Sequence, residues 1–236
     1  MPDNLIKVLL ISGNDNHKWH HWEETTPLIK EALEEKESIH VTVSYEIEVL
    51  ADESLLAFDV IAFNYCNWQD PTELSAQAKT NLVAFAEQGG GLVILHFANG
   101  AFHFSLPEAG QSDWSEYRRM VPRVWNHHGG SRHDRYGEFE VTITDGSHPI
   151  TQGIPSFMVQ DELYFHQEGE VDIHILYSAV SQITNQAEPL AWVSQYHSSR
   201  VYQTLLGHDR NAYLVEEVRE TLRRGTIWAA NMKGEA

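Results

Sequence analysis

The sequence predicts an α/β fold built on an open, mostly parallel sheet with helices on both of its faces. Two observations carry this prediction. Strand candidates alternate with helical segments through the first 96 residues, a pattern typical of parallel sheets. The strand candidates are also apolar along most of their length, as strands covered on both faces are.

The first half of the chain reads as a succession of strands and helices. Leu5–Ser12 is a buried-strand candidate, and Trp22–Lys36 is helical in composition, with Pro27 tolerable only in the first turn. His40–Leu50 alternates apolar and polar residues, as a strand with one exposed face does. Asp59–Cys66 has a continuous apolar centre and predicts a further buried strand.

A second strand–helix–strand unit follows. Asp70-Pro71-Thr72-Glu73 offers an N-cap, a proline at the first helical position and a capping-box glutamate. Apolar residues then mark one helical face as far as Ala86, and Gly89–Gly91 ends the helix. Leu92–His96 comes directly after as a short buried strand.

The second half begins with a long irregular insertion, Phe97–Tyr136, in which Ser112–Met120 is the one helix candidate. The last predicted element is an amphipathic helix at Asn211–Arg224, ended by Gly225. Four strand candidates lie between the insertion and this helix: Glu138–Thr144, His174–Ala179, Leu190–Ser194 and Arg200–Leu206. No repeat or linker divides the chain, so we expect a single domain over residues 1–236.

Composition narrows the range of partners. A formal charge of −18 and a pI near 5.1 oppose binding to nucleic acids and anionic membranes, which leaves a neutral molecule or a cation as the expected partner. One cysteine, Cys66, excludes an internal disulfide and a cysteine-rich metal site. The first residues lack the pattern of a secretory signal, so a cytoplasmic location is expected. The oligomeric state stays open, with a homo-oligomer among the expectations.

Three apolar runs end in or near a histidine: His17, His96 and His208. If the runs are parallel strands, their carboxyl ends meet at one edge of the sheet, where such folds place ligands. Glu162 is the acidic side chain that we expect beside them. We predict that these four residues are catalytic and hold one divalent ion. Nitrogen and oxygen ligands suit zinc, whereas carboxylate and water would favour manganese.

The three histidines also have plainer interpretations, which for His17 is a surface loop whose rings pack locally. His96 follows a buried strand at a sharp turn, where a nucleophile elbow would hold serine or cysteine, so its histidine disfavours acyl transfer. It is otherwise a satisfied core histidine. His208 follows Gly207 in what is otherwise a simple turn. Asp161 could instead orient one of the histidines without binding the ion itself. Cys66 is a candidate thiolate nucleophile, but a small buried hydrophobic residue is the stronger interpretation.

Aromatic and polar side chains near these histidines are candidates to bind the substrate. The aromatic candidates are Trp19, Trp22 and Trp125. The loop from Trp125 to His133 could also act as a substrate lid or hold a second metal ion, although exposed histidine and arginine side chains in a flexible loop are the favoured interpretation. The remaining predicted substrate-binding residues are His127, His128, Arg132 and Tyr164.

The sequence resembles the ThuA-like family, named for trehalose utilisation, over nearly its whole length. The matching segments are Ser12-Gly13 with His17, Gly89 to His96, His148 to Thr151, Asp161 to Tyr164, Arg200 to Tyr202, Leu206 to His208 and Gly225 to Trp228. The resemblance implies a three-layer fold of the glutamine amidotransferase-like or flavodoxin-like kind and a role in sugar catabolism. The chain departs from the family pattern in its extra histidines: His20, His21, His127, His128 and His133.

Together these observations predict an enzyme of carbohydrate catabolism. The expected reaction is metal-assisted hydrolysis, elimination or isomerisation of a sugar or keto-sugar, such as a trehalose-like glycoside. The alternative is a non-catalytic carbohydrate-binding or regulatory module on the same fold. A cysteine-dependent amidase that uses Cys66 is a second rival.

Overall fold

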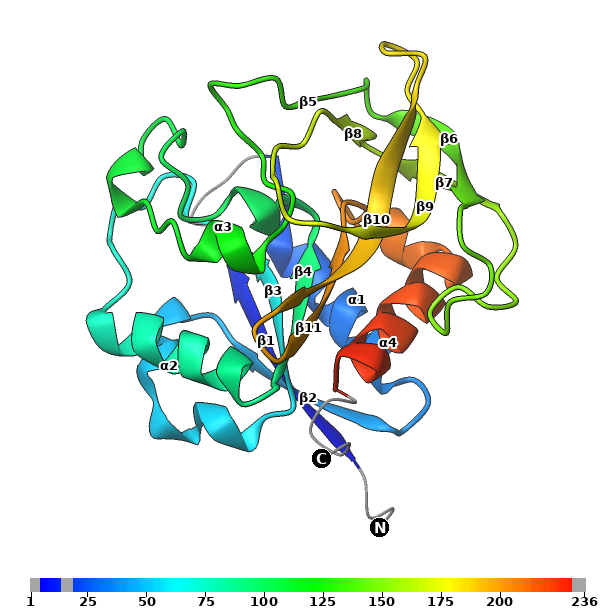
Figure 1. The fold of residues 1–236 in the computed structure, drawn as a ribbon. Helices are drawn as coiled ribbons and strands as arrows, with labels where there is room; N and C mark the ends of the chain where they lie inside the picture. Colours follow the sequence, from blue (N-terminus) through cyan, green and yellow to red (C-terminus); the bar gives the residue numbers. More distant parts are fainter. Residues whose placement is uncertain (1–4, 14–18, 231–236) are drawn as a thin grey trace.

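The computed structural model describes residues 5–13 and 19–230, and its centre is a nine-stranded sheet in the order β2-β1-β3-β4-β11-β10-β9-β6-β7 (Figure 1). The first five strands in this order run parallel to one another: β1 Ile6–Gly13, β2 Ile39–Ser44, β3 Val60–Tyr65, β4 Gly91–Leu95 and β11 Ser199–Thr204. The other four pair antiparallel: β6 Gly137–Ile143, β7 Phe157–Asp161, β9 His174–Val180 and β10 Ala187–Tyr196. The predicted open α/β sheet is confirmed.

Helices cover both faces of the parallel part. The chain passes from β1 to β2 in one direction along the sheet and from β3 to β4 in the other, so right-handed crossovers place their helices on opposite faces. Helix α1 (Trp22–Glu34) packs beside α4 (Glu216–Ala230), whereas α2 (Ala76–Glu87) covers the second face with the 3₁₀ helices Ile47–Ala51 and Glu53–Ala57 (Figure 1). The strands between them are buried, as their apolar runs predict.

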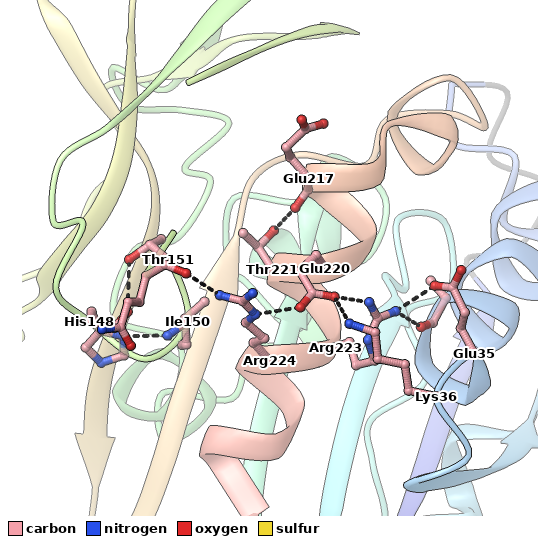
Figure 2. Close-up of polar contacts among 12 residues, drawn as sticks. Glu35, Lys36, His148, Ile150, Thr151, Glu217, Glu220, Thr221, Arg223 and Arg224 are labelled. Atoms are coloured by element: carbon pink, nitrogen blue, oxygen red, sulfur yellow. Dashed lines mark hydrogen bonds and ion pairs between the residues drawn. The ribbon is translucent and has the colours of Figure 1, made fainter. Parts of the chain in front are cut away.

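A polar network joins the two helices on the first face. Figure 2 shows Glu220 of α4 between Arg223, Arg224 and Lys36, with Lys36 Nζ at 2.9 Å and Arg224 Nε at 2.6 Å. Arg223 is 1% exposed, and it donates to the carbonyl of Ala32 at 2.9 Å in α1. Because a buried guanidinium needs partners for its donors, this network fixes how α4 lies against α1.

Two expected boundaries differ from the structure. The strand predicted over His40–Leu50 ends at Ser44, and a 3₁₀ helix begins at Ile47. Helix α2 begins at Ala76, because the Ser75 hydroxyl caps it by accepting from the Ala78 N–H at 3.1 Å. Asp70, the predicted cap, accepts from the N–H of Thr72 at 2.9 Å in the preceding turn.

In α1 and α4, the positions of a proline and a glycine also differ from those that the sequence predicts. Pro27 lies inside α1 rather than in its first turn. Gly225 lies inside α4 rather than after it, since the helix continues to Ala230. A Cβ at Gly225 would lie 2.3 Å from the Tyr202 ring, so this glycine permits close helix–sheet packing and does not act as a cap.

The insertion after β4 is irregular, as predicted. Its helix is shorter than the expected Ser112–Met120: α3 spans only Tyr117–Met120, and further 3₁₀ turns occupy His96–Gly100 and Gly110–Ser112. Its end pairs with the segment after β7 in a small two-stranded sheet, β5 Arg132–His133 with β8 Tyr164–Phe165. Across residues 5–13 and 19–230, no helix combines the length and apolarity that a membrane crossing requires.

Candidate metal centre

Four side chains converge at the edge of the sheet where β4, β7 and β11 end. His20 precedes α1, His96 follows β4, Glu162 follows β7 and His208 comes after β11. One nitrogen or oxygen atom from each lies within 4.8 Å of the others. The ring centroids of His96 and His208 are 5.6 Å apart, and His20 lies 4.9 Å and 5.2 Å from them. Three imidazoles and a carboxylate form a common ligand set for a divalent ion.

His96 has the geometry of a neutral ligand. Its φ of +44° is rare for a residue with a side chain, and it turns the chain sharply after β4, as a nucleophile elbow does. The ring is 3% exposed, and burial lowers the pKa of His96 to about 3. Its Nδ1 lies 2.6 Å from the carbonyl oxygen of Leu205. A carbonyl can only accept, so Nδ1 carries the proton and Nε2 presents its lone pair to the cluster.

His208 and Glu162 form a close pair. Nδ1 of His208 lies 3.1 Å from Oε2 of Glu162, yet this buried nitrogen has no partner in hydrogen-bond geometry. Burial favours the neutral form of both groups, but each one stabilises the charge of the other. The pKa of Glu162 is therefore lowered overall and that of His208 is raised. A buried imidazole nitrogen outside hydrogen-bond geometry fits a metal ligand, provided that the ring loses its proton when the ion binds.

Tyr164 connects the cluster to the space beside it. Its hydroxyl lies 3.1 Å from Nε2 of His96 and 3.3 Å from Nε2 of His20. Because Nε2 of His96 is an acceptor, the hydroxyl donates to His96 and accepts from His20. The His20 ring also stacks on Phe97, with centroids 4.4 Å apart and planes at 10°.

An aromatic pocket of about 290 Å³ opens on one side of the cluster. Trp19 stands at its exposed rim, while Trp68 is almost fully buried and meets both Trp19 and His127 edge to face. None of the described residues that line the pocket is a lysine or an arginine. Its lining is Trp19, His20, Trp68, Phe97, Trp125, His127, His133, Glu162 and Tyr164.

A second, much smaller cavity of about 20 Å³ lies against His20, His96 and His208. His20 and Phe97 line both cavities, so this stacked pair lies between them. The small cavity has room for about one water molecule. Cys66 also lines it and is buried, which agrees with the expectation of a small buried residue.

The structure brings together three of the four predicted catalytic residues: His96, Glu162 and His208. The fourth, His17, lies outside the described residues. Four predicted substrate-binding residues line the aromatic pocket: Trp19, Trp125, His127 and Tyr164. Three do not line it: Trp22, which packs near Tyr45 and lines the small cavity, and the exposed His128 and Arg132.

Sequence reasoning did not assign four residues to the site: His20, Trp68, Phe97 and His133. The sequence marks His20 only as one of the extra histidines. Its place in the site can be inferred from the fold, because the residue just before the first helix of an α/β unit lies at the ligand-binding edge of the sheet. Trp68 has the same signal, since it follows the end of β3.

The sequence model of the ThuA family, described as trehalose utilisation, matches residues 7–229. No curated protein matches the chain.

Solved structures with the same fold are similar along most of the chain. A ThuA-like protein from Parabacteroides merdae superposes with a TM-score of 0.79 at 24% identity, covering 96% of this chain and 90% of its own. A ThuA-like protein from Bacteroides uniformis gives 0.71 at 16% identity, covering 95% and 91%. A cytoplasmic protein from Salmonella typhimurium gives 0.58 at 16% identity, covering 84% and 87%. At these sequence identities, the similarity shows only that the fold is shared.

Proposed function

Because the chain belongs to the ThuA family, described as trehalose utilisation, we propose that it is a metal-dependent enzyme of carbohydrate catabolism. In this proposal the aromatic pocket binds a sugar, and His20, His96, Glu162 and His208 hold one divalent ion at its inner end. The reaction is hydrolysis, elimination or isomerisation of a sugar or keto-sugar.

The donor set supports a metal. Ligand atoms about 2 Å from one zinc ion lie at most about 4 Å apart, so small side-chain rotations would bring the 4.8 Å cluster onto an ion. His96 directs Nε2 into the cluster, with its other nitrogen held by the Leu205 carbonyl, and an ion would replace the Tyr164 hydroxyl as the partner of this Nε2. His208 Nδ1 has no competing hydrogen bond. Three nitrogen ligands favour zinc over manganese, which prefers oxygen.

The pocket supports a neutral sugar as the bound molecule. Trp19, Trp68 and Trp125 offer broad apolar faces, and sugar rings present C–H groups that pack on such faces. A lining without lysine or arginine among its described residues offers nothing to pair with phosphate or carboxylate. Glu162 and the exposed His133, whose Oε1 and Nδ1 atoms are 3.5 Å apart, also line the pocket and can hydrogen-bond sugar hydroxyls.

The proposed ion and the side chains around it have different roles in the reaction. When bound, a divalent ion polarises a sugar carbonyl or lowers the pKa of a water molecule. Tyr164 lines the pocket and also touches His96 and His20, so its hydroxyl is placed to give a proton to the sugar or to take one from it. Buried Phe97 and Trp68 keep bulk water away from this end of the pocket.

The observation that carries this proposal is the convergence of four ligand atoms beside an aromatic pocket. Elemental analysis of protein purified without a histidine tag tests it. We expect about one zinc or manganese per chain, its loss in His96→Ala, and its retention in His174→Ala, a matched change at an exposed histidine. A screen of oxidised and unoxidised disaccharides, with and without divalent ions, then identifies the substrate. Metal-free wild-type protein that stays inactive when ions are added would contradict the proposal.

The aromatic pocket by itself also fits a non-catalytic carbohydrate-binding module. The two functions differ in their need for the cluster. A binding module would keep its sugar affinity in His96→Ala and would turn over no substrate, whereas the enzyme loses turnover in that variant. A cytoplasmic location and a homo-oligomer stay predictions.

A further inference from the structure

A buried carboxylate lies behind the cluster and lines neither of its two cavities. Asp161 is the last residue of β7 and is 0% exposed. Its Oδ2 accepts from the Gly207 N–H at 2.7 Å, and its Oδ1 accepts from the N–H groups of His208 at 3.2 Å and Glu162 at 2.7 Å. Charge-assisted bonds of this kind are strong and directional. Burying a carboxylate costs free energy, so its position calls for an explanation.

The turn that Asp161 holds is one that few residues could form. Gly207 has a φ of +128°, where side chains are rarely tolerated, and a Cβ there would lie 2.4 Å from the hydroxyl oxygen of Tyr213. This backbone directs two consecutive N–H groups at one carboxylate, an arrangement that binds anions. The direction in which His208 leaves the main chain is thereby fixed.

The same carboxylate also fixes the other partner of His208. By accepting from the N–H of Glu162, Asp161 holds the backbone from which the Glu162 side chain reaches His208. Residues 162 and 208 are far apart in the sequence and follow different strands. Asp161 therefore sets the relative position of two of the four cluster residues.

We propose that Asp161 is a positioning residue of the candidate metal centre, which holds Glu162 and His208 at the spacing that one ion requires. This inference rests on the proposed function. It assigns Asp161 no contact with the sugar or the ion. A carboxylate with a purely structural role would stabilise the fold but would leave the metal affinity of the folded protein unchanged.

The test compares Asp161→Asn with Asp145→Asn. Asp145 also accepts from the backbone N–H groups of two consecutive residues, Ser147 and His148. It follows the C-terminal end of β6, whereas Asp161 pairs with the N-terminal end of that strand. We expect Asp161→Asn to weaken zinc binding 10- to 100-fold, measured by competition with a chromophoric chelator, and to alter the visible spectrum of the cobalt-loaded protein. Asp145→Asn should change neither.

A measurement on the unmodified protein covers the case in which Asp161→Asn does not fold. Hydrogen exchange of the Gly207 and His208 amides should be slow with or without metal, because both donate to a buried carboxylate. Rapid exchange at both amides, or equal zinc affinity and an unchanged cobalt spectrum in folded Asp161→Asn, would overturn the inference alone. A wild-type protein that binds no metal would overturn the proposed function, and this inference with it.

Discussion

At the scale of single residues, Tyr164 is where the cluster and the aromatic pocket meet. Its ring lines the pocket, with its centroid 4.8 Å from that of the Trp125 ring. Its hydroxyl contacts both His96 and His20. In the proposed function the ring and the hydroxyl therefore have separable roles, the first in sugar binding and the second in proton transfer. A change that removes only the oxygen tests this separation.

Tyr164→Phe should reduce turnover at least tenfold, because positioned proton transfer contributes about 10²- to 10⁴-fold to rates. Its sugar affinity should change by less than about threefold, since the ring that packs on the sugar is retained. Steady-state kinetics and calorimetric titration measure the two quantities. Tyr177→Phe, which removes a core hydroxyl bonded to Thr204, is the matched control. Unchanged turnover in Tyr164→Phe would show that the hydroxyl moves no proton.

Asp145 gives a pH-dependent prediction away from the site. Hydrogen bonds from the Ser147 hydroxyl and N–H, and from His174, hold the pKa of Asp145 well below its usual value. A depressed pKa stabilises the fold above the unfolded-state value, and the stabilisation is lost as the pH falls toward the folded-state pKa. Asp145→Asn should thus lower the free energy of unfolding at pH 7, with a difference that shrinks below about pH 4. Urea denaturation over this range checks it, and a difference that grows on acidification contradicts it.

The sequence predicts some site residues better than others, for a physical reason. His96 and His208 follow buried strands, whose ends are visible in the apolar pattern, so their place at one edge can be inferred. Which histidine of the first loop joins them depends on where α1 begins, and His21 at its N-cap makes no side-chain capping bond that would mark the start. Trp68 enters the pocket through contacts with Trp19, Phe97 and His127, which no local pattern shows.

At the scale of elements, the packing of α4 on the sheet overrides the helix-end signals of the sequence. Glycine is typical of a helix C-cap, yet the chain stays helical through Gly225. The Tyr202 ring fills the space that a Cβ would need, which accounts for glycine at this position. The cap of α2 shows a similar limit, since Asp70 and Ser75 are both good caps and tertiary packing selects Ser75. Strand positions were more predictable than helix ends, because continuous burial leaves a stronger pattern in the sequence.

Gly225→Ala should destabilise the protein by about 1–3 kcal/mol through overpacking against Tyr202. Helix propensity alone predicts the opposite sign, a gain of about 1 kcal/mol. Thr80→Ala, at an exposed position inside α2, is the control and should stabilise by a few tenths of a kcal/mol. Urea denaturation of the three proteins decides between the two effects, and a more stable Gly225→Ala would refute the packing argument.

At the scale of the whole molecule, the proposed ion would join four separate parts of the fold. Its ligands precede α1 and follow β4, β7 and β11, so an ion bound there links distant segments of the sheet. The formal charge of −18 attracts cations to the protein surface in general. The affinity of a specific metal site must exceed this general attraction.

Removing the ion should lower the thermal stability of the folded protein. An ion at 100 times its Kd stabilises the native state by about 2.7 kcal/mol, so adding a chelator should lower the Tm by several degrees. Calorimetry before and after re-addition of zinc measures the change. His96→Ala should show no such dependence, whereas His174→Ala should behave like the wild type. An identical zinc response in His96→Ala would mean that the ion stabilises the protein from another site.

The most direct test of the metal centre is a crystal structure of the zinc-treated protein with anomalous data collected above the zinc absorption edge. We expect one strong peak bonded to His20, His96, Glu162 and His208. Strong zinc peaks elsewhere, with none between these four side chains, would contradict it.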